Sequence, residues 1–180
     1  KSVAQEILSL LIHHRGPLIL DSFCGTGMST TKIAADHPDA LVIGIDKSSS
    51  RLSKHLPMPY QNYRLFQATC EHVWAELVQA QVSCQKHYLL YPNPWPKKGH
   101  LKRRIHGHPS FPLLKALGGL IEVRSNWKIY VDEFAKASKL LGLQAETTAL
   151  SVTDPLTLFE RKYALDHQGL WRCTAHALDH

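Results

Sequence analysis

Residues 18–36 have the sequence LILDSFCGTGMSTTKIAAD, in which a short apolar run meets a glycine turn and then a helical pattern. Glycines in such a turn let the backbone bend sharply and approach a ligand without a side-chain clash. The run predicts a buried strand over 18–20, and the pattern after it predicts a helix over 28–36 that ends before Pro38. A strand, a glycine turn and a helix in this order are typical of an α/β protein with a ligand at the turn.

The rest of the chain repeats the alternation of strands and helices. Apolar runs predict further strands over residues 41–45, 64–66, 87–91 and 119–123, and two final strands over about 144–152 and 170–177. Helical patterns occupy residues 2–14, 72–79 and 128–141, and a Ser-rich helix start follows Asp46. No repeat or linker divides the chain. We therefore predict a single α/β domain over residues 1–180, with a mostly parallel, doubly wound sheet.

Composition limits the class of protein. A chain of 180 residues that is 44% hydrophobic and 20% charged can bury one core, which excludes a disordered or collagen-like chain. No apolar run approaches the roughly 18 residues of a membrane helix, so we expect no membrane partner. The four cysteines show no CxxC spacing, which favours a reducing cytoplasm over a disulfide scaffold or zinc ribbon. No signal peptide is visible, and we expect the natural N-terminus to be longer than this sequence.

Positive charge is concentrated in one stretch of the chain. The net charge is +6, and no carboxylate lies between Glu76 and Glu122. Seven cations lie in that stretch: Lys86, Lys97, Lys98, Lys102, Arg103, Arg104 and Lys115. A solvated basic loop would also carry such charge, but a block of one sign favours a polyanion as the partner, and we expect that partner to be nucleic acid.

Two carboxylates flank the glycine turn in a way that indicates a cofactor. Gly25 and Gly27 match only part of the GxGxxG pattern of dinucleotide sites, because Thr30 occupies the third glycine position. Asp21 precedes the turn, where a carboxylate suits a cationic ligand better than a pyrophosphate. Asp46 ends the second strand, where a carboxylate can accept both hydroxyls of a ribose. S-adenosylmethionine, an adenosyl ligand with an ammonium group and no phosphate, satisfies these features.

The predicted strand over 87–91 leads into a loop suited to a nucleobase. Its sequence, Pro92-Asn93-Pro94-Trp95-Pro96, is made rigid by three prolines. Trp95 offers a stacking face, and Asn93 offers an acceptor and a donor to a base edge. Lys97, Lys98, Lys102, Arg103 and Arg104 follow and can hold phosphates. The loop therefore predicts an RNA-binding segment beside the cofactor.

These motifs resemble those of the bacterial tRNA (guanine-N7)-methyltransferase family, as a divergent or shortened member. The matching stretches, in chain order, are DSFCGTGMST (21–30), GIDKS (44–48), YPNPWPKKGHLKRR (91–104), HPSF (108–111), GGLIEVRSNWKIY (118–130) and TLFERKY (157–163). The resemblance implies a Rossmann-like class I methyltransferase fold, for which we expect an antiparallel C-terminal strand. It also implies a cytoplasmic enzyme, expected to be a monomer, that transfers methyl from S-adenosylmethionine to guanine N7 in tRNA.

The resemblance assigns roles to individual residues. The cofactor-binding set comprises Asp21, Gly25, Gly27, Asp46, Thr69 and Asn93, of which Asn93 is also the expected catalytic residue. The substrate-binding set comprises Trp95, Lys97, Arg103, Arg104, Asn126, Thr157 and Glu160. Family members usually carry aspartate where this chain has Asn93 and Asn126, and an acidic residue where it has Thr69.

Other functions remain open at this point. The Asn-Pro-Trp loop is similar to the Asn/Asp-Pro-Pro-aromatic loop of amino-group methyltransferases, so another RNA, nucleobase or amine is an alternative substrate. A non-catalytic RNA-binding paralogue is another alternative. A hydride-transferring enzyme is disfavoured by Asp21 and Thr30. We expect no metal site, because His106 and His108 could chelate but no third ligand has a useful spacing.

Overall fold

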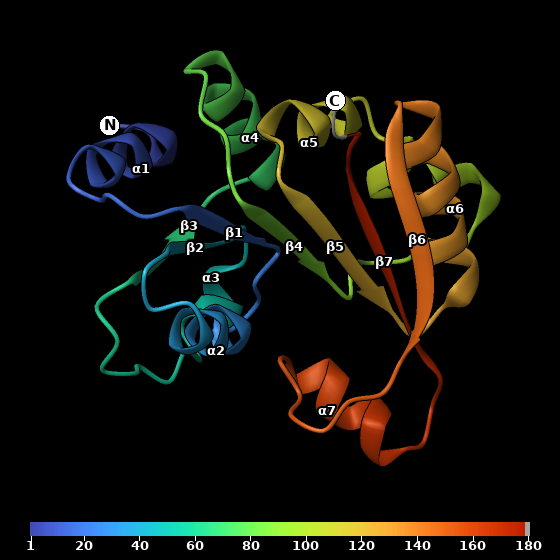
Figure 1. The fold of residues 1–180 in the computed structure, drawn as a ribbon. Helices are drawn as coiled ribbons and strands as arrows, with labels where there is room; N and C mark the ends of the chain where they lie inside the picture. Colours follow the sequence, from blue (N-terminus) through green and yellow to red (C-terminus); the bar gives the residue numbers. More distant parts are fainter. Residues whose placement is uncertain (179–180) are drawn as a thin grey trace.

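Seven strands form one sheet in the computed structural model, which describes residues 1–178 (Figure 1). The strands are β1 (Leu18–Ser22), β2 (Leu41–Asp46), β3 (Tyr63–Gln67), β4 (Lys86–Leu90), β5 (Leu120–Ser125), β6 (Leu143–Leu150) and β7 (Leu170–Ala177). Their order across the sheet is β3-β2-β1-β4-β5-β7-β6. The first five pair in parallel, whereas β7 runs antiparallel to both β5 and β6. The predicted mostly parallel sheet with an antiparallel C-terminal strand is confirmed.

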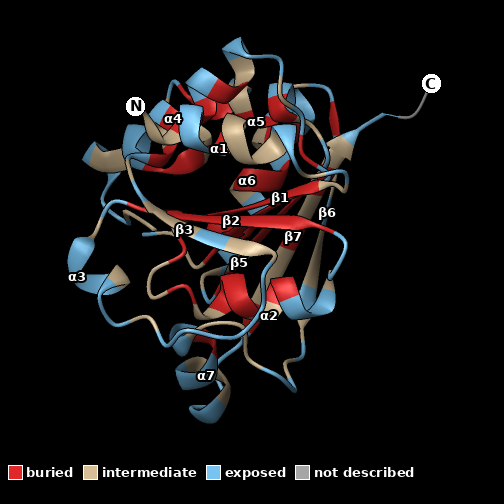
Figure 2. Ribbon diagram, turned by 90° about the vertical axis from the view of Figure 1, so that its left-hand side faces the viewer, coloured by how far each residue is buried: buried red, intermediate tan, exposed pale blue. Residues whose placement is uncertain are grey.

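Helices cover both faces of this sheet (Figure 2). One face carries α1 (Val3–Ile12), α4 (Cys70–Gln79), α5 (Phe111–Leu117) and α6 (Lys128–Leu140). The opposite face carries α2 (Met28–Asp36) and α7 (Leu158–Leu165), and the short α3 (Ser49–Leu52) follows β2. The sheet is therefore doubly wound, as the alternating pattern predicts. No helix within residues 1–178 is long and apolar enough to cross a membrane.

Burial explains why the first strands were visible in the sequence. Every residue of β1 and β2 is buried, because helices cover both sides of these central parallel strands. Trp74, Leu77 and Phe134 belong to the larger core cluster on one face, and Ile33 and Val42 to the smaller cluster on the other. These two apolar layers fix the sheet between the helices.

Two helices were not predicted from the sequence. Helix α5 has seven residues and α7 has eight, so each completes only about two turns, too few for a clear 3.6-residue periodicity. Residues 98–103 and 105–107 also form 3₁₀ turns within the basic stretch, for which the sequence predicted no helix. The strand predicted over 18–20 extends to Ser22, where it carries the chain into the glycine turn.

The order of the strands places a ligand site at one edge of the sheet. β1 lies between β2 and β4, and the chain builds the sheet outward in opposite directions from this point. In open α/β sheets a ligand binds outside the carboxyl ends of the strands at such a reversal. The glycine turn after β1 and the loop after β4 both emerge there (Figure 1).

Candidate active site

A cavity of about 600 Å³ lies at the carboxyl ends of β1 and β4. It is lined from four parts of the chain: the glycine turn and the start of α2, the segment after β2 with Glu71 of α4, the segment after β4 as far as Ile105, and residues 157–162. This volume is within the usual size range of small-molecule sites. Both segments that the sequence singled out, the glycine turn and the Pro-Asn-Pro-Trp-Pro loop, therefore face one cavity.

Unusual backbone conformations gather around this cavity. Phe23, Tyr91 and Trp95 have φ angles of 60°, 52° and 43°, and all three line the cavity. Positive φ is uncommon for residues with a Cβ, costs on the order of 1–3 kcal/mol where it is strained, and occurs preferentially at functional sites. The Phe23 ring packs edge-on against the Trp74 ring, with 5.8 Å between the ring centroids. The fold thus holds the cavity walls in conformations that a relaxed chain avoids.

The glycine turn approaches the cavity with bare backbone. Gly25 has φ +62°, and a Cβ built there would meet no atom within 4 Å, so this glycine leaves open space for a ligand. Gly27 has φ +80°, and a Cβ there would lie 2.6 Å from a methyl carbon of Leu65. Gly27 is therefore required for packing and for the start of α2, whereas Gly25 is the one that faces the cavity.

Asp46 ties the turn to the end of β2. One carboxylate oxygen accepts the N–H of Gly25 at 2.9 Å, and the other accepts the N–H of Ser48 at 2.8 Å and the Arg51 guanidinium at 3.0 Å. Its side chain is 1% exposed and is not among the cavity-lining groups. Arg51 is about half exposed and lines the cavity, so the buried carboxylate is connected to the cavity wall through this side chain.

Asp21 is buried beneath the turn. Its Oδ2 accepts hydrogen bonds from the hydroxyls of Ser29 at 2.6 Å and Thr30 at 2.8 Å, whereas Oδ1 has no partner within residues 1–178. Burial raises the pKa of this carboxyl from 3.8 to about 6, against the opposing effect of the two hydroxyls. A buried acceptor without a partner favours a cationic group in its vicinity. Asp21 itself does not line the cavity.

The loop after β4 presents Asn93 in a defined orientation. The side-chain Oδ1 of Asn93 accepts the backbone N–H of Trp95 at 3.1 Å, and the NH₂ group of this cavity-lining residue makes no hydrogen bond within residues 1–178. Arg103 lies over the Trp95 ring with its guanidinium carbon 5.0 Å from the centroid. The Arg103 cation is thus stacked on the Trp95 indole at the cavity wall.

Arg104, which was expected to contact phosphate, is buried and bonded within the protein instead. Its side chain is 5% exposed, and its Nη1 donates to both carboxylate oxygens of Glu133, at 2.6 and 3.0 Å. It also donates to the carbonyl oxygens of Trp95 at 3.0 Å and Pro96 at 3.4 Å, and its guanidinium lies over the Trp127 ring. Arg104 therefore fixes the Trp95 loop and is not available to an RNA backbone in this structure.

Some of the site residues named from the sequence line the cavity, and others do not. Five of them line the cavity: Gly25, Asn93, Trp95, Arg103 and Thr157. The others do not: Asp21, Gly27, Asp46, Thr69, Lys97, Arg104, Asn126 and Glu160. Thr69 is exposed at the start of α4, and Asn126 is exposed with its amide 3.4 Å from Gln168. Lys97 is exposed next to the cavity loop, at the start of a 3₁₀ turn.

Sequence reasoning missed several groups in the wall. Three exposed cations, Lys47, Arg51 and Lys54, line the cavity after β2, and Leu158 and Phe159 line it from α7. The Asp46-Lys47-Ser48 stretch offered a signal, because residues directly after an acidic strand end point into the same crevice. Within residues 1–178 no group of three or more histidine, cysteine, aspartate or glutamate side chains is placed to hold a metal.

Curated relatives match most of the chain. The chain is 27% identical over 166 residues to a tRNA (guanine-N(7)-)-methyltransferase of Thiobacillus denitrificans, a match that covers 86% of this chain and 73% of the relative. It is 28% identical over 178 residues to a protein of the same name from Yersinia pseudotuberculosis, with 91% and 74% covered. Each of these matches covers more than four-fifths of this chain and about three-quarters of the relative.

Solved structures show the fold, and a family model shows the family. The antibiotic-resistance methyltransferase Kmr has a TM-score of 0.65 at 17% identity and covers 100% of this chain and 95% of its own. A 16S rRNA (adenine(1408)-N(1))-methyltransferase from Catenulisporales acidiphilia, solved with cosubstrate SAM, has a TM-score of 0.67 at 17% identity, with 99% and 93% covered. The fold is that of class I methyltransferases. Residues 15–173 match the family Methyltransf_4, described as "Putative methyltransferase". The chain belongs to this methyltransferase family.

Proposed function

We propose that this protein transfers a methyl group from S-adenosylmethionine to N7 of a guanine in tRNA. The observation that carries the proposal is the single cavity in which the glycine turn meets the Asn93–Trp95 loop and residues 157–159. The same three segments lie within residues 15–173, which match the methyltransferase family, and relatives that match most of the chain are named tRNA (guanine-N(7)-)-methyltransferase. We place the reaction in the cytoplasm, where tRNA is modified.

The glycine turn and its carboxylates suit S-adenosylmethionine. When bound, this cofactor supplies an electrophilic methyl group on a sulfonium. The bare backbone at Gly25 leaves room for it, and the Asp46 carboxylate accepts ribose hydroxyls once Arg51 moves aside. The unpartnered Oδ1 of buried Asp21 favours positive charge nearby. Three independent features of this turn therefore match a cationic adenosyl ligand without phosphates.

The chemistry needs positioning more than acid–base catalysis. Guanine N7 carries a free lone pair, so its methylation removes no proton and requires no general base. Holding two reactants in line is worth about 7–11 kcal/mol, which makes orientation of the base the main task of the protein. Trp95 offers a stacking face, and Asn93 offers a hydrogen bond at the same wall. Neither residue has to change its protonation state.

Exposed cations next to the cavity supply the grip on RNA. Lys97, Lys98, Lys102 and Arg103 are all exposed on the segment that follows the Trp95 loop. Lys162 and the three cations after β2 add positive charge to the cavity wall. Because RNA affinity depends on phosphate neutralisation, this side of the cavity is the one that faces tRNA.

A substituted transcript tests the proposal. We incubate the protein with labelled S-adenosylmethionine and either an ordinary tRNA transcript or one in which 7-deazaguanosine replaces guanosine. The ordinary transcript should take up label, and the 7-deaza transcript, which has carbon at the target position, should take up none. Equal labelling of both transcripts would place the methyl group on another atom and overturn the proposal.

A further inference from the structure

A segment between β6 and β7 forms part of the cavity wall. We call residues 151–165, which include α7, the strap. Thr157, Leu158, Phe159 and Lys162 of the strap line the same cavity as the glycine turn and the Asn93 loop. Leu158 and Phe159 are each about half exposed, so apolar side chains are presented at the opening. The position of the strap therefore decides what shape a base meets on that side.

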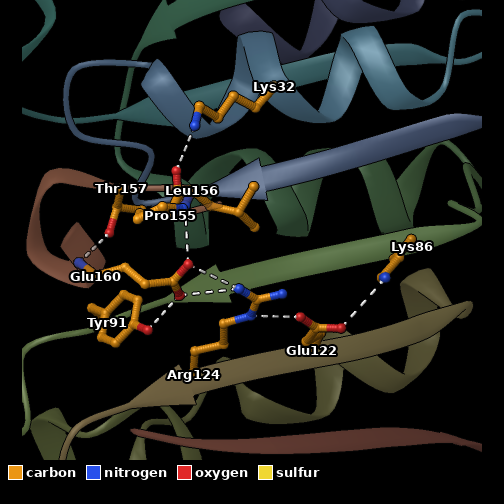
Figure 3. A network of polar contacts seen from close by, with 9 residues as sticks. All are labelled: Lys32, Lys86, Tyr91, Glu122, Arg124, Pro155, Leu156, Thr157 and Glu160. Carbon is orange, nitrogen blue, oxygen red and sulfur yellow. Dashed lines mark hydrogen bonds and ion pairs between the residues drawn. The ribbon is translucent and has the colours of Figure 1, made fainter. Parts of the chain in front are cut away.

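Glu160 fastens the strap from inside. Its side chain is fully buried, and Figure 3 shows it at the centre of a polar network. Oε1 accepts the backbone N–H of Leu156 at 2.9 Å and an Arg124 N–H at 3.1 Å. Oε2 accepts the same Arg124 nitrogen at 3.0 Å and the Tyr91 hydroxyl. A carboxylate has about four acceptor positions, so Glu160 has none left for a substrate.

The network connects the strap to the strands beneath the cavity. Arg124 of β5 also donates to buried Glu122 at 2.8 Å, and Glu122 lies 3.4 Å from the Lys86 ammonium of β4 (Figure 3). Two acids and two cations thus balance one another in a largely buried network. Tyr91 directly follows β4, lines the cavity and lies two residues before Asn93. The network therefore links the strap to the loop that reads the base.

A second contact, between Lys32 and the start of the strap, differs from the Glu160 anchor in being exposed to solvent. Lys32 of α2 contacts the strap at Asp154 and at the carbonyl oxygen of Pro155, both at 2.7 Å. Asp154 is 81% exposed in its side chain, so solvent screens that pair. The carboxylate of Glu160 is shielded from solvent, and removal of one of its partners leaves buried charge unsatisfied. The Glu160 end is the anchor on which the geometry depends.

We propose that Glu160, Arg124 and Tyr91 form a latch that holds the strap in place, so that Thr157, Leu158 and Phe159 meet the target base. In this role Glu160 is a positioning residue that acts through the strap and does not touch the substrate. The inference rests on the proposed function for its effect on methyl transfer, but the latch itself can be tested without that function.

Tryptic cleavage measures the latch directly. Arg161 and Lys162 are exposed on the strap, but they lie in α7 and are protected while α7 stays folded. Tyr91→Phe removes one donor to the buried Glu160 carboxylate, and Glu160→Gln neutralises that carboxylate beside Arg124, so each should speed cleavage at these sites about tenfold. Tyr163→Phe, which removes a hydroxyl that makes no hydrogen bond within residues 1–178, is the matched control and should change cleavage less than about twofold.

Methyl transfer then distinguishes positioning from contact. Tyr91→Phe and Glu160→Gln should lower the single-turnover rate about tenfold, leave the Kd for tRNA and for S-adenosylmethionine unchanged, and act non-additively together. If Glu160→Gln slows transfer while cleavage and Tyr91→Phe activity stay at wild-type values, Glu160 contacts the substrate and the latch is wrong. Unchanged cleavage in both variants would also refute it. Faster cleavage in a protein that methylates no tRNA would support the latch and overturn only the proposed function.

Discussion

Replacing Asn93 with aspartate changes one group at the cavity wall and leaves its support intact. The Trp95 N–H occupies Oδ1 of Asn93 at 3.1 Å, and an aspartate oxygen can accept the same bond. The substitution therefore exchanges only the NH₂ group of this cavity-lining residue for a carboxylate oxygen. Because the loop keeps its hydrogen bond, we expect Asn93→Asp to fold with a Tm close to that of the wild type.

The expected change in the rate of methyl transfer follows from the hydrogen-bonding groups on the edge of guanine. Guanine offers two adjacent donors, N1–H and N2–H, which a carboxylate accepts and an NH₂ group opposes. Correcting a mismatched hydrogen bond gains about 1–3 kcal/mol, or about 5- to 150-fold in rate if the gain is realised in the transition state. We therefore predict that Asn93→Asp methylates tRNA guanine faster than the wild type.

Single-turnover transfer to unmodified tRNA is the assay, with Asn126→Asp as the matched control. Asn126 is exposed and does not line the cavity, so the same exchange there should change the rate less than about twofold. A slower Asn93→Asp enzyme would refute the reasoning. It would mean that the NH₂ group of Asn93 donates to an acceptor on the base, such as guanine O6, and that the loop reads the opposite edge.

Three further predictions concern the cofactor and the RNA. Asp46→Ala should weaken binding of S-adenosylmethionine by about 1.5–3 kcal/mol in calorimetry, and unchanged affinity in a folded variant would remove Asp46 from the site. Burial raises the pKa of Asp21 from 3.8 to about 6, so its ionisation lowers the free energy of unfolding as pH rises through that range. Asp21→Asn should therefore raise the free energy of unfolding in denaturant by up to about 3 kcal/mol at pH 7 and leave it unchanged below pH 4. An equal gain at both pH values would contradict this. Neutralising Lys102 and Arg103 together should reduce the salt dependence of tRNA binding. The slope of log affinity against log salt concentration should fall by about 0.7 for each phosphate that these side chains neutralise in the wild type. An unchanged slope would mean that both side chains are solvated and do not contact phosphate.

The sheet was predictable because its central strands are buried on both faces. Residues 18–22 and 41–46 are nearly continuous apolar runs with an aspartate at or near the end, and such runs with glycine punctuation are typical of buried parallel strands. The antiparallel last strand was expected from the family resemblance. Helix α7 was not predicted, because eight weakly amphipathic residues take their helical form from the buried Glu160 and from the cap at Thr157.

The site was predictable only where function lies in consecutive residues. The Gly25 turn and the Asn93–Trp95 loop are local motifs, and the structure brings both to one cavity. The burial of Arg104 depends on Glu133, a partner 29 residues away. The saturation of Glu160 likewise depends on Arg124, 36 residues away. Sequence spacing carries no information about such pairs, so a charged residue within a basic motif gives no sign that it is an internal anchor.

Mass spectrometry of nucleosides tests the central claim most directly. Unmodified tRNA is incubated with the protein and S-adenosylmethionine carrying a deuterated methyl group, digested to nucleosides and compared with a reaction that lacks the protein. The account predicts deuterated 7-methylguanosine as the only labelled nucleoside. Label in a methyladenosine or in a guanosine methylated at another atom, or no label in any nucleoside while the cofactor binds, would contradict it.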